Sequence, residues 1–182
     1  MKIKYSSPAL VLVPVFALLG FAVLSNPLGA APRGVNLLAN GDFQKGLRDW
    51  DATSWKRRGK ITIDKEVLHR GRPTLRLESD EADHTMANQI IEVKPNTTYR
   101  LTAYVKTAGI RFLEKGKDGA CLGIRGTFEK SDPVPATCDW RLLTFEFDSK
   151  NRTTVEVGPH LGWHASTVTG TAWFADLHLE EK

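Results

Sequence analysis

Residues 170–180, Gly-Thr-Ala-Trp-Phe-Ala-Asp-Leu-His-Leu-Glu, decide the fold of this chain. Apolar and polar side chains interleave in this stretch and β-forming residues dominate it, so it predicts a strand at the end of the domain. The alternation slips near Ala175, where we expect a β-bulge. A last strand of this kind is expected to pair with an early segment and to close an all-β domain.

The expected early partner is residues 36–46, Asn-Leu-Leu-Ala-Asn-Gly-Asp-Phe-Gln-Lys-Gly, with Trp50 a few residues on. Two internal segments complete the pattern: Asn-Thr-Thr-Tyr-Arg-Leu-Thr-Ala-Tyr-Val-Lys-Thr at 96–107 and Asp-Trp-Arg-Leu-Leu-Thr-Phe-Glu-Phe at 139–147. Together these segments resemble the carbohydrate-binding modules of bacterial cellulases and xylanases, families four, nine, sixteen and twenty-two. The resemblance spans about residues 36–182. It implies a galactose-binding-domain-like jelly roll that binds sugars without catalysis.

Periodicity gives the same fold class. Short β-rich runs separated by Gly, Pro, Asn and Asp turn signals predict strands near 60–64, 73–78, 87–93, 98–107, 119–126, 140–148, 153–158 and 171–180. Such a series indicates an all-β, two-sheet antiparallel β-sandwich of jelly-roll type. We expect its core to draw on Leu75, Leu77, Ile90, Val93, Leu101, Ala103, Val105, Leu143, Phe145, Phe147, Val155, Val157, Phe174 and Leu177.

The first 31 residues are typical of an N-terminal hydrophobic leader. Lys2 and Lys4 precede an apolar run over 9–24, and small residues follow at 29–31. This layout predicts a signal peptide cleaved after Ala30 or Ala31, with an uncleaved N-terminal membrane anchor as the alternative. Residues 32–35 would be a short linker. Either way we expect a secreted or extracytoplasmic domain, in contact with a membrane only through the leader if it is uncleaved.

The charge balance gives no case for nucleic-acid binding. The formal net charge is +4, and Lys2, Lys4 and Arg33 account for three of those charges, so the domain itself is near neutral. A basic cluster, Lys56-Arg57-Arg58-Gly59-Lys60, stands out within it. This cluster could attract an acidic glycan or a lipid head group, or it could be a solvated loop.

Cys121 and Cys138 are the two cysteines of the chain. They flank the loop 127–137, and the leader directs the domain to an oxidising compartment, so we predict a disulfide that closes this loop. By loop-entropy reasoning such a bridge would contribute about 3 kcal/mol to stability. Two free buried thiols are the alternative.

No common catalytic motif is present, and no enzyme activity is expected. His160 and His164 lie in a stretch with loop composition, where a polar rim is favoured over a metal site. Asp80, Glu81 and Asp83 beside His84 form an acidic cluster, and paired carboxylates are what glycoside hydrolysis needs. Three acids so close in sequence predict a solvated turn instead.

The family resemblance also implies a structural calcium ion between the two chain ends, held by a Glu and an Asp among other ligands. Here those positions are Gln44 and Ala175, which leaves Asp42, Gln44 and Asp176 as the remnant ligands. Calcium prefers several oxygens with carboxylate charge, so we expect binding to be weak or lost. The alternative is that Gln44 and Asp176 hydrogen-bond to each other across the seam.

Sugar binding needs aromatic rings outside the core and polar partners for hydroxyl groups. The candidate rings are Trp55 before the basic cluster, Phe112 in Ile110-Arg-Phe-Leu, and Trp163 between Gly162 and His164. Trp163 has little core to occupy in a loop, and Gly162 would let a ligand approach its ring, although a ring folded back onto the sandwich is an equal alternative. By alternation, polar partners on the outer strand faces would come from Arg76, Asn88, Gln89, Arg100, Arg125 and Glu156. Of these, Arg125 joins His164 and the three rings as a predicted ligand-binding residue.

These features predict a secreted or envelope-tethered, non-catalytic module that binds a polysaccharide or glycoconjugate. The alternative is a structural or adhesion β-sandwich that binds another envelope protein, which the missing calcium carboxylates and the few aromatic candidates favour.

Overall fold

The computed structural model describes residues 34–112 and 118–182; the expected leader lies outside these residues. The described part folds entirely into strands and turns. Its strands are β1 (Asp51–Ser54), β2 (Gly59–His69), β3 (Arg72–Asp83), β4 (Thr85–Glu92), β5 (Thr98–Phe112), β6 (Ala120–Ile124), β7 (Cys138–Asp148), β8 (Thr154–Leu161) and β9 (Val168–Glu181). Every predicted strand is confirmed, most of them longer than expected, and β1 was not predicted. Within these residues there is no helix long and apolar enough to cross a membrane.

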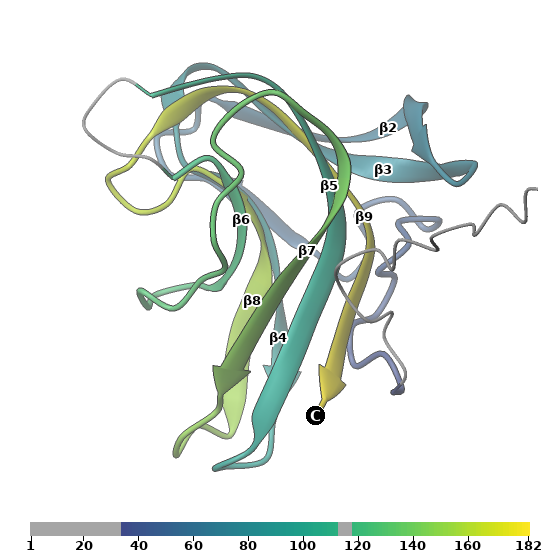
Figure 1. Ribbon diagram of the computed structural model, residues 1–182, viewed down its shortest axis with the longest axis vertical. Helices are drawn as coiled ribbons and strands as arrows, with labels where there is room; N and C mark the ends of the chain where they lie inside the picture. The colour runs from purple at the N-terminus through teal and green to yellow at the C-terminus, as the bar shows by residue number, and fades with distance from the viewer. Residues whose placement is uncertain (1–33, 113–117) are drawn as a thin grey trace, which may run out of the picture.

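The strands form two antiparallel sheets that pack face to face (Figure 1). One sheet has four strands in the order β1-β4-β8-β6, and the other has five in the order β2-β3-β9-β5-β7. The all-β sandwich predicted from the sequence is therefore confirmed. Most neighbouring strands in each sheet are distant in sequence, so long connections rather than short hairpins join them.

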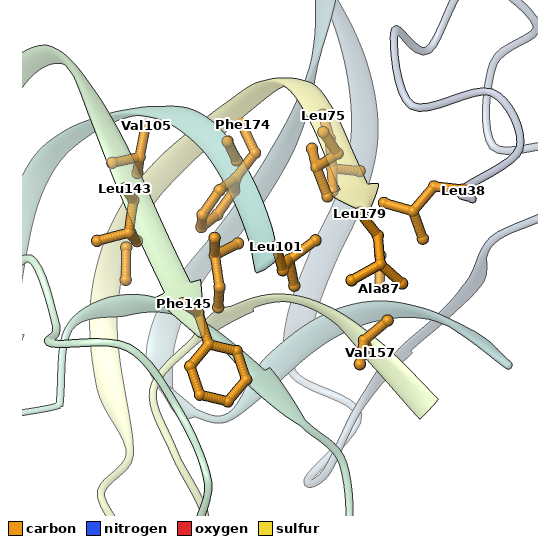
Figure 2. Close-up of a cluster of buried hydrophobic side chains, with 14 of the residues drawn as sticks. Leu38, Leu75, Ala87, Leu101, Val105, Leu143, Phe145, Val157, Phe174 and Leu179 are labelled. Carbon is orange, nitrogen blue, oxygen red and sulfur yellow. The ribbon is translucent and has the colours of Figure 1, made fainter. Parts of the chain in front are cut away.

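The core lies between the two sheets, as Figure 2 shows for side chains from both of them. Leu75, Leu101 and Phe174 of the five-stranded sheet and Val157 of the four-stranded sheet are fully buried. Burying side chains of this size contributes about 1.5–3 kcal/mol each to the hydrophobic driving force. The predicted core residues are all buried except Ile90, which is 73% exposed.

Ile90 is exposed because two adjacent isoleucines of β4 cannot face the same side of a sheet. Ile91 packs against the core, and the alternation therefore places Ile90 on the outer face opposite Glu156. The prediction that Ile90 is a core residue is wrong, because the core position is the next residue, Ile91.

β9 lies in the middle of its sheet, and the N-terminal segment completes its pairing. The Leu37 amide donates to the Leu179 carbonyl at 2.8 Å, and the Leu177 amide donates to the Gly41 carbonyl at 2.9 Å. Asn36 adds two side-chain hydrogen bonds, to the Leu177 carbonyl and from the Leu179 amide. The predicted contact between the two ends of the domain is confirmed, although residues 36–46 form turns rather than a strand.

The bulge expected near Ala175 is also present. The register between β5 and β9 shifts between Thr102 and Tyr104, and Asp176 has a φ of 49°. A left-handed residue inside a strand breaks the two-residue alternation, which explains the slip in the sequence pattern.

The predicted disulfide is wrong: Cys121 and Cys138 are both free. Cys121 lies on β6 and pairs with His160, whereas Cys138 begins β7 in the other sheet. The intervening loop first folds back along β6, where Val134 and Ala120 exchange two backbone hydrogen bonds, and only then crosses to β7. The cysteines thus lie on different sheets, and backbone pairing holds the loop against β6.

The two thiols should differ sharply in reactivity. Burial raises the pKa of the Cys121 thiol to about 12, whereas Cys138 is partly exposed. We expect a thiol reagent at pH 8 to modify Cys138 alone in the native protein and both cysteines after unfolding without reductant, as counted by intact mass. The Cys138→Ser variant should show no reaction while folded. If neither cysteine reacts in the unfolded, unreduced chain, the predicted disulfide is present after all.

Candidate functional site

Two glycines lie side by side on the outer face of the four-stranded sheet. Gly158 of β8 and Gly123 of β6 are register partners, and neither presents a side chain to this face. A Cβ atom at Gly123 would lie 2.2 Å from Cη2 of Trp163, so the indole ring packs directly over this glycine. Trp163 is consequently only 4% exposed. The ring is thus folded back onto the sandwich, which was the alternative expected for Trp163, and Gly123 of β6 makes the space for it.

Gly162 has a conformational role instead. Its φ is 83°, and a Cβ atom there would approach the Asp83 carbonyl oxygen to 2.9 Å. It leads into a tight turn in which the amides and carbonyls of Trp163 and Ser166 exchange hydrogen bonds of 3.0 and 2.9 Å. His164 lies at the tip of this turn, and its Nε2 donates to the Thr127 carbonyl at 2.6 Å. This bond requires the proton on Nε2, and it joins the turn to the loop that follows β6.

Trp55 is presented by a turn that a buried carboxylate organises. The Arg57 amide donates to the Ser54 carbonyl, and Arg57 has a φ of 59°. The Asp83 carboxylate accepts hydrogen bonds from the amides of Lys56 at 2.8 Å, Arg58 at 2.9 Å, Gly59 at 3.3 Å and its neighbour His84 at 2.7 Å. A turn with a non-glycine left-handed residue is strained, and these bonds hold it in place.

The acidic cluster is therefore not a simple solvated turn. Asp80 and Glu81 are exposed and pair with Lys60 and Arg58, but Asp83 is fully buried at the end of β3. Burial raises the pKa of Asp83, and the hydrogen bonds from Lys56, Arg58, His84 and Ser54 outweigh that effect, so the pKa lies below its usual value. Asp83 stays ionised and positions the turn.

These elements enclose a cavity of about 460 Å³, a size usual for small-molecule sites. Four of the five predicted ligand-binding residues line it, although they are far apart in sequence: Trp55, Arg125, Trp163 and His164. The remaining lining residues are Thr53, Ser54, Arg57, His84, Met86, Gly126 and His160. Trp55 is the exposed ring of the cavity, at 59%, and buried Trp163 is part of its wall.

Phe112 does not join this group. It lies at the end of β5, where it pairs with Val168 and packs against the core. Phe128, which the sequence analysis did not single out, stands instead at the rim: it is 86% exposed, and its ring centroid lies 4.8 Å from that of His164. Its position depends on the return of the loop along β6, for which the sequence gives no local signal.

Buried nitrogens in the cavity wall lack partners. His84 Nε2 and His160 Nδ1 share a hydrogen bond of 2.8 Å, so one of these rings donates and the other accepts. His160 Nε2 and Trp163 Nε1 have no hydrogen-bond partner among the described residues, and both residues are more than nine-tenths buried. Unpaired polar atoms of this kind are costly unless a ligand or water meets them.

The two histidines are neutral at physiological pH. Burial lowers the pKa of His84 to about 4; repulsion by His164 adds to this effect, attraction to Asp83 opposes it, and repulsion by Arg125 adds a smaller lowering. Burial also lowers the pKa of His160 well below its usual value, again with repulsion from His84 and Arg125. Both rings therefore act as hydrogen-bonding groups and not as cations.

A second cavity, of about 530 Å³, holds the remnant calcium ligands Asp42 and Asp176. Asp176 accepts from His69 Nδ1 at 3.0 Å and from Arg72 Nη1 at 3.3 Å. Gln44 donates to Asp42 and not to Asp176, contrary to the expected alternative. Within 34–112 and 118–182 there is no group of three or more His, Cys, Asp or Glu residues that could hold a metal ion.

The larger cavity is less suited to sugar stacking. Its aromatic ring, Tyr104, is covered by the Arg70 guanidinium at 4.8 Å from the ring centroid, and the same arginine donates to the Tyr104 hydroxyl. The carboxylates of this cavity already have partners within the protein. The cavity around Trp55 is therefore the stronger candidate site.

Asp83→Asn tests the organisation of the Trp55 turn. The amide cannot accept all four hydrogen bonds and places an NH₂ group against backbone donors, so we expect a loss of about 3 kcal/mol in the free energy of unfolding. Asp80→Asn breaks only an exposed ion pair and should cost less than about 1 kcal/mol. Urea unfolding of both variants measures the difference, and equal small losses would show that Asp83 does not organise the turn.

The buried histidines should make stability fall on mild acidification. Between pH 6.5 and about 4 they take up protons in the unfolded chain but not in the folded one, so the free energy of unfolding drops as the pH falls through this window. Each ring contributes up to about 1.4 kcal/mol per pH unit. Urea unfolding from pH 7.5 to 4.5 should show a clearly smaller slope for His84→Gln. An unchanged slope would contradict the neutral, buried state of His84.

Curated relatives match most of this chain but only a small part of their own length. The chain is 36% identical over 160 residues to the tRNA(Glu)-specific nuclease WapA of Bacillus subtilis subsp. natto, and 35% identical over 164 residues to the tRNA nuclease WapA of Bacillus subtilis strain 168. Each match covers 80% of this chain and 7% of the relative.

Solved structures share the fold. The family 16 carbohydrate-binding module-2 has a TM-score of 0.57 at 20% identity, covering 80% of this chain and all of that one. The module TmCBM61, solved with β-1,4-galactotriose, has 0.55 at 19%, covering 82% and 100%. The xylan-binding CBM22-1 domain of Paenibacillus barcinonensis Xyn10C has 0.55 at 15%, covering 84% and 97%. Residues 35–166 also match the family described as a carbohydrate binding domain. The chain is thus a member of the carbohydrate binding domain family.

Proposed function

We propose that this protein is a secreted or envelope-tethered, non-catalytic module that binds a glycan in the cavity on the outer face of the four-stranded sheet. The observation that carries the proposal is the convergence of Trp55, Arg125, Trp163 and His164 on one cavity. These residues come from three different loops or strand ends, and each is of a type that sugar recognition uses.

Exposed apolar side chains around the cavity support this assignment. Trp55, Ile90 and Phe128 are among the few large hydrophobic residues that are exposed, and all three belong to this face or its rim. The apolar face of a pyranose ring would cover Trp55, while sugar hydroxyls would meet the polar lining residues Thr53 and Arg125.

The proposal is for binding without turnover. In the described part of the chain no carboxylate lines the cavity, whereas glycoside hydrolysis uses a pair of them across the scissile bond. The nuclease activity named for the WapA relatives belongs to proteins of which this chain matches 7%, so we propose a shared domain and not a shared activity. Secretion rests on the leader expected from the sequence.

Trp55→Ala should weaken glycan binding about 5- to 30-fold, because an exposed ring that stacks on a sugar contributes about 1–2 kcal/mol to affinity. The side chain is exposed, so the melting temperature should change by less than about 2 °C. Isothermal titration or affinity electrophoresis against a panel of neutral and acidic polysaccharides measures the affinity.

Leu68→Ala is the matched control, since it removes an exposed apolar side chain from the other sheet. It should leave binding unchanged. If Trp55→Ala retains full affinity for a glycan that the wild type binds, the site lies elsewhere. If the folded wild type binds no glycan of the panel, the proposed function is wrong, and a protein partner becomes the better explanation of this face.

A further inference from the structure

The arginines that line the candidate site have no carboxylate beside them in its described lining. The lining residues include Arg57, Arg125 and three histidines, and no Asp or Glu among the described residues lines the cavity. Trp163 Nε1 is a donor only, and it is buried without a partner in the described chain. Because the lining holds arginine cations and no carboxylate among the described residues, it favours an anionic sugar over a neutral one.

Arg57 is a cation that the protein leaves uncompensated. Its neighbours Arg58 and Lys60 form ion pairs with Glu81 at 2.8 Å and Asp80 at 3.2 Å. The Asp83 carboxylate beneath the turn is buried and already saturated by backbone amides. Arg57 itself pairs with no carboxylate in the described part of the chain. The turn therefore directs two of its basic residues to internal partners and leaves Arg57 at the cavity.

Arg125 is held in place by two carboxylates outside the lining. Both Asp51, at 3.0 Å, and Glu156, at 2.7 Å, contact the same nitrogen, Nη1. These two bonds fix the plane of the guanidinium and leave Nε and Nη2 without a protein partner among the described residues. A planar guanidinium with free donors is suited to a carboxylate or phosphate group.

We propose, building on the function proposed above, that this cavity selects an acidic glycan, with Arg57 meeting an oxyanion on the sugar. The anionic group supplies the negative charge that the described lining residues lack. The Nε and Nη2 groups of Arg125 complete the set of donors around it. The apolar face of the same sugar lies on Trp55. A uronate carboxylate, a sulfate and a phosphodiester share this chemistry.

Polygalacturonate and its fully methyl-esterified form provide a matched test, because esterification removes the charge and keeps the backbone. Chondroitin sulfate and a glycerol phosphate polymer separate sulfate and phosphate from carboxylate. We expect the full-length protein to bind at least one charged polymer at least tenfold more tightly than any neutral one. If polygalacturonate is that polymer, its methyl-esterified form should bind no more tightly than the neutral polymers. Arg57→Gln should reduce this affinity about tenfold, which corresponds to one charge-assisted contact.

Arg141→Gln is the control, since it removes an exposed positive charge from β7 in the opposite sheet. It should bind like the wild type at 150 mM salt, where unspecific attraction is screened. Equal losses in the two variants, or equal binding of charged and neutral polymers, would overturn the selectivity. Preference for a neutral polymer with dependence on Trp55 would overturn it and leave the proposed function standing. If the folded protein binds none of the polymers, both proposals fail.

Discussion

The position of β9 in the middle of the five-stranded sheet is the constraint on which the rest of the structure depends. Its first half pairs with β3, its whole length follows β5, and its last residues take the N-terminal segment as a partner where β3 no longer reaches. Asn36 makes this third pairing specific, since one amide side chain bonds both the Leu177 carbonyl and the Leu179 amide. β9 is hydrogen-bonded along both edges, and its core face is apolar. This explains why its sequence carries the strongest fold signal.

The candidate site lies on the outer face of the opposite sheet. Trp163 packs over Gly123 there and forms part of the cavity wall. The walls come from two turns whose shape is set from within: Asp83 gathers the backbone amides around Trp55, and His164 joins the 163–166 turn to the loop after β6. A sheet flanked by two turns that are each held by hydrogen bonds is suited to keeping exposed rings at fixed positions. Such preorganisation lowers the entropy lost on binding.

Alternation in the sequence was sufficient to predict the strands, the sandwich and nearly all of the core, because burial on one face of a strand is a local pattern with a period of two. The misplacement of Ile90 shows the limit of that pattern, since an Ile-Ile pair leaves the register undetermined. The disulfide prediction failed for a different reason. Spacing between Cys121 and Cys138 does not reveal that the loop between them returns along β6 before it changes sheets.

The site was only partly predictable from the residue types. Trp55, Trp163, His164 and Arg125 were chosen for chemistry, and the structure brings them together. Asp83 and His84 were expected in a solvated turn and His160 at a polar rim, yet all three are buried. For Asp83 the reason is that β3 extends beyond its predicted end. This extension places Asp83 beneath a turn about 25 residues earlier in the sequence. Contacts of that range have no sequence signature of their own.

The two cavities show how the same fold treats charge in opposite ways. Around Asp176, His69 and Arg72 supply donors to a carboxylate at the seam of the chain ends, so that the protein itself provides the positive partner there. Around Trp55 the carboxylates Asp51, Glu156 and Asp83 lie outside the lining and are occupied by other groups, while Arg57 lines the cavity without an acidic partner in the described chain. An internally neutralised cavity offers little to a charged ligand, whereas a cavity with an uncompensated cation gains affinity from an anion at short range. The chemistry of this face therefore depends less on the number of aromatic rings than on which of its charges the fold has left unpaired.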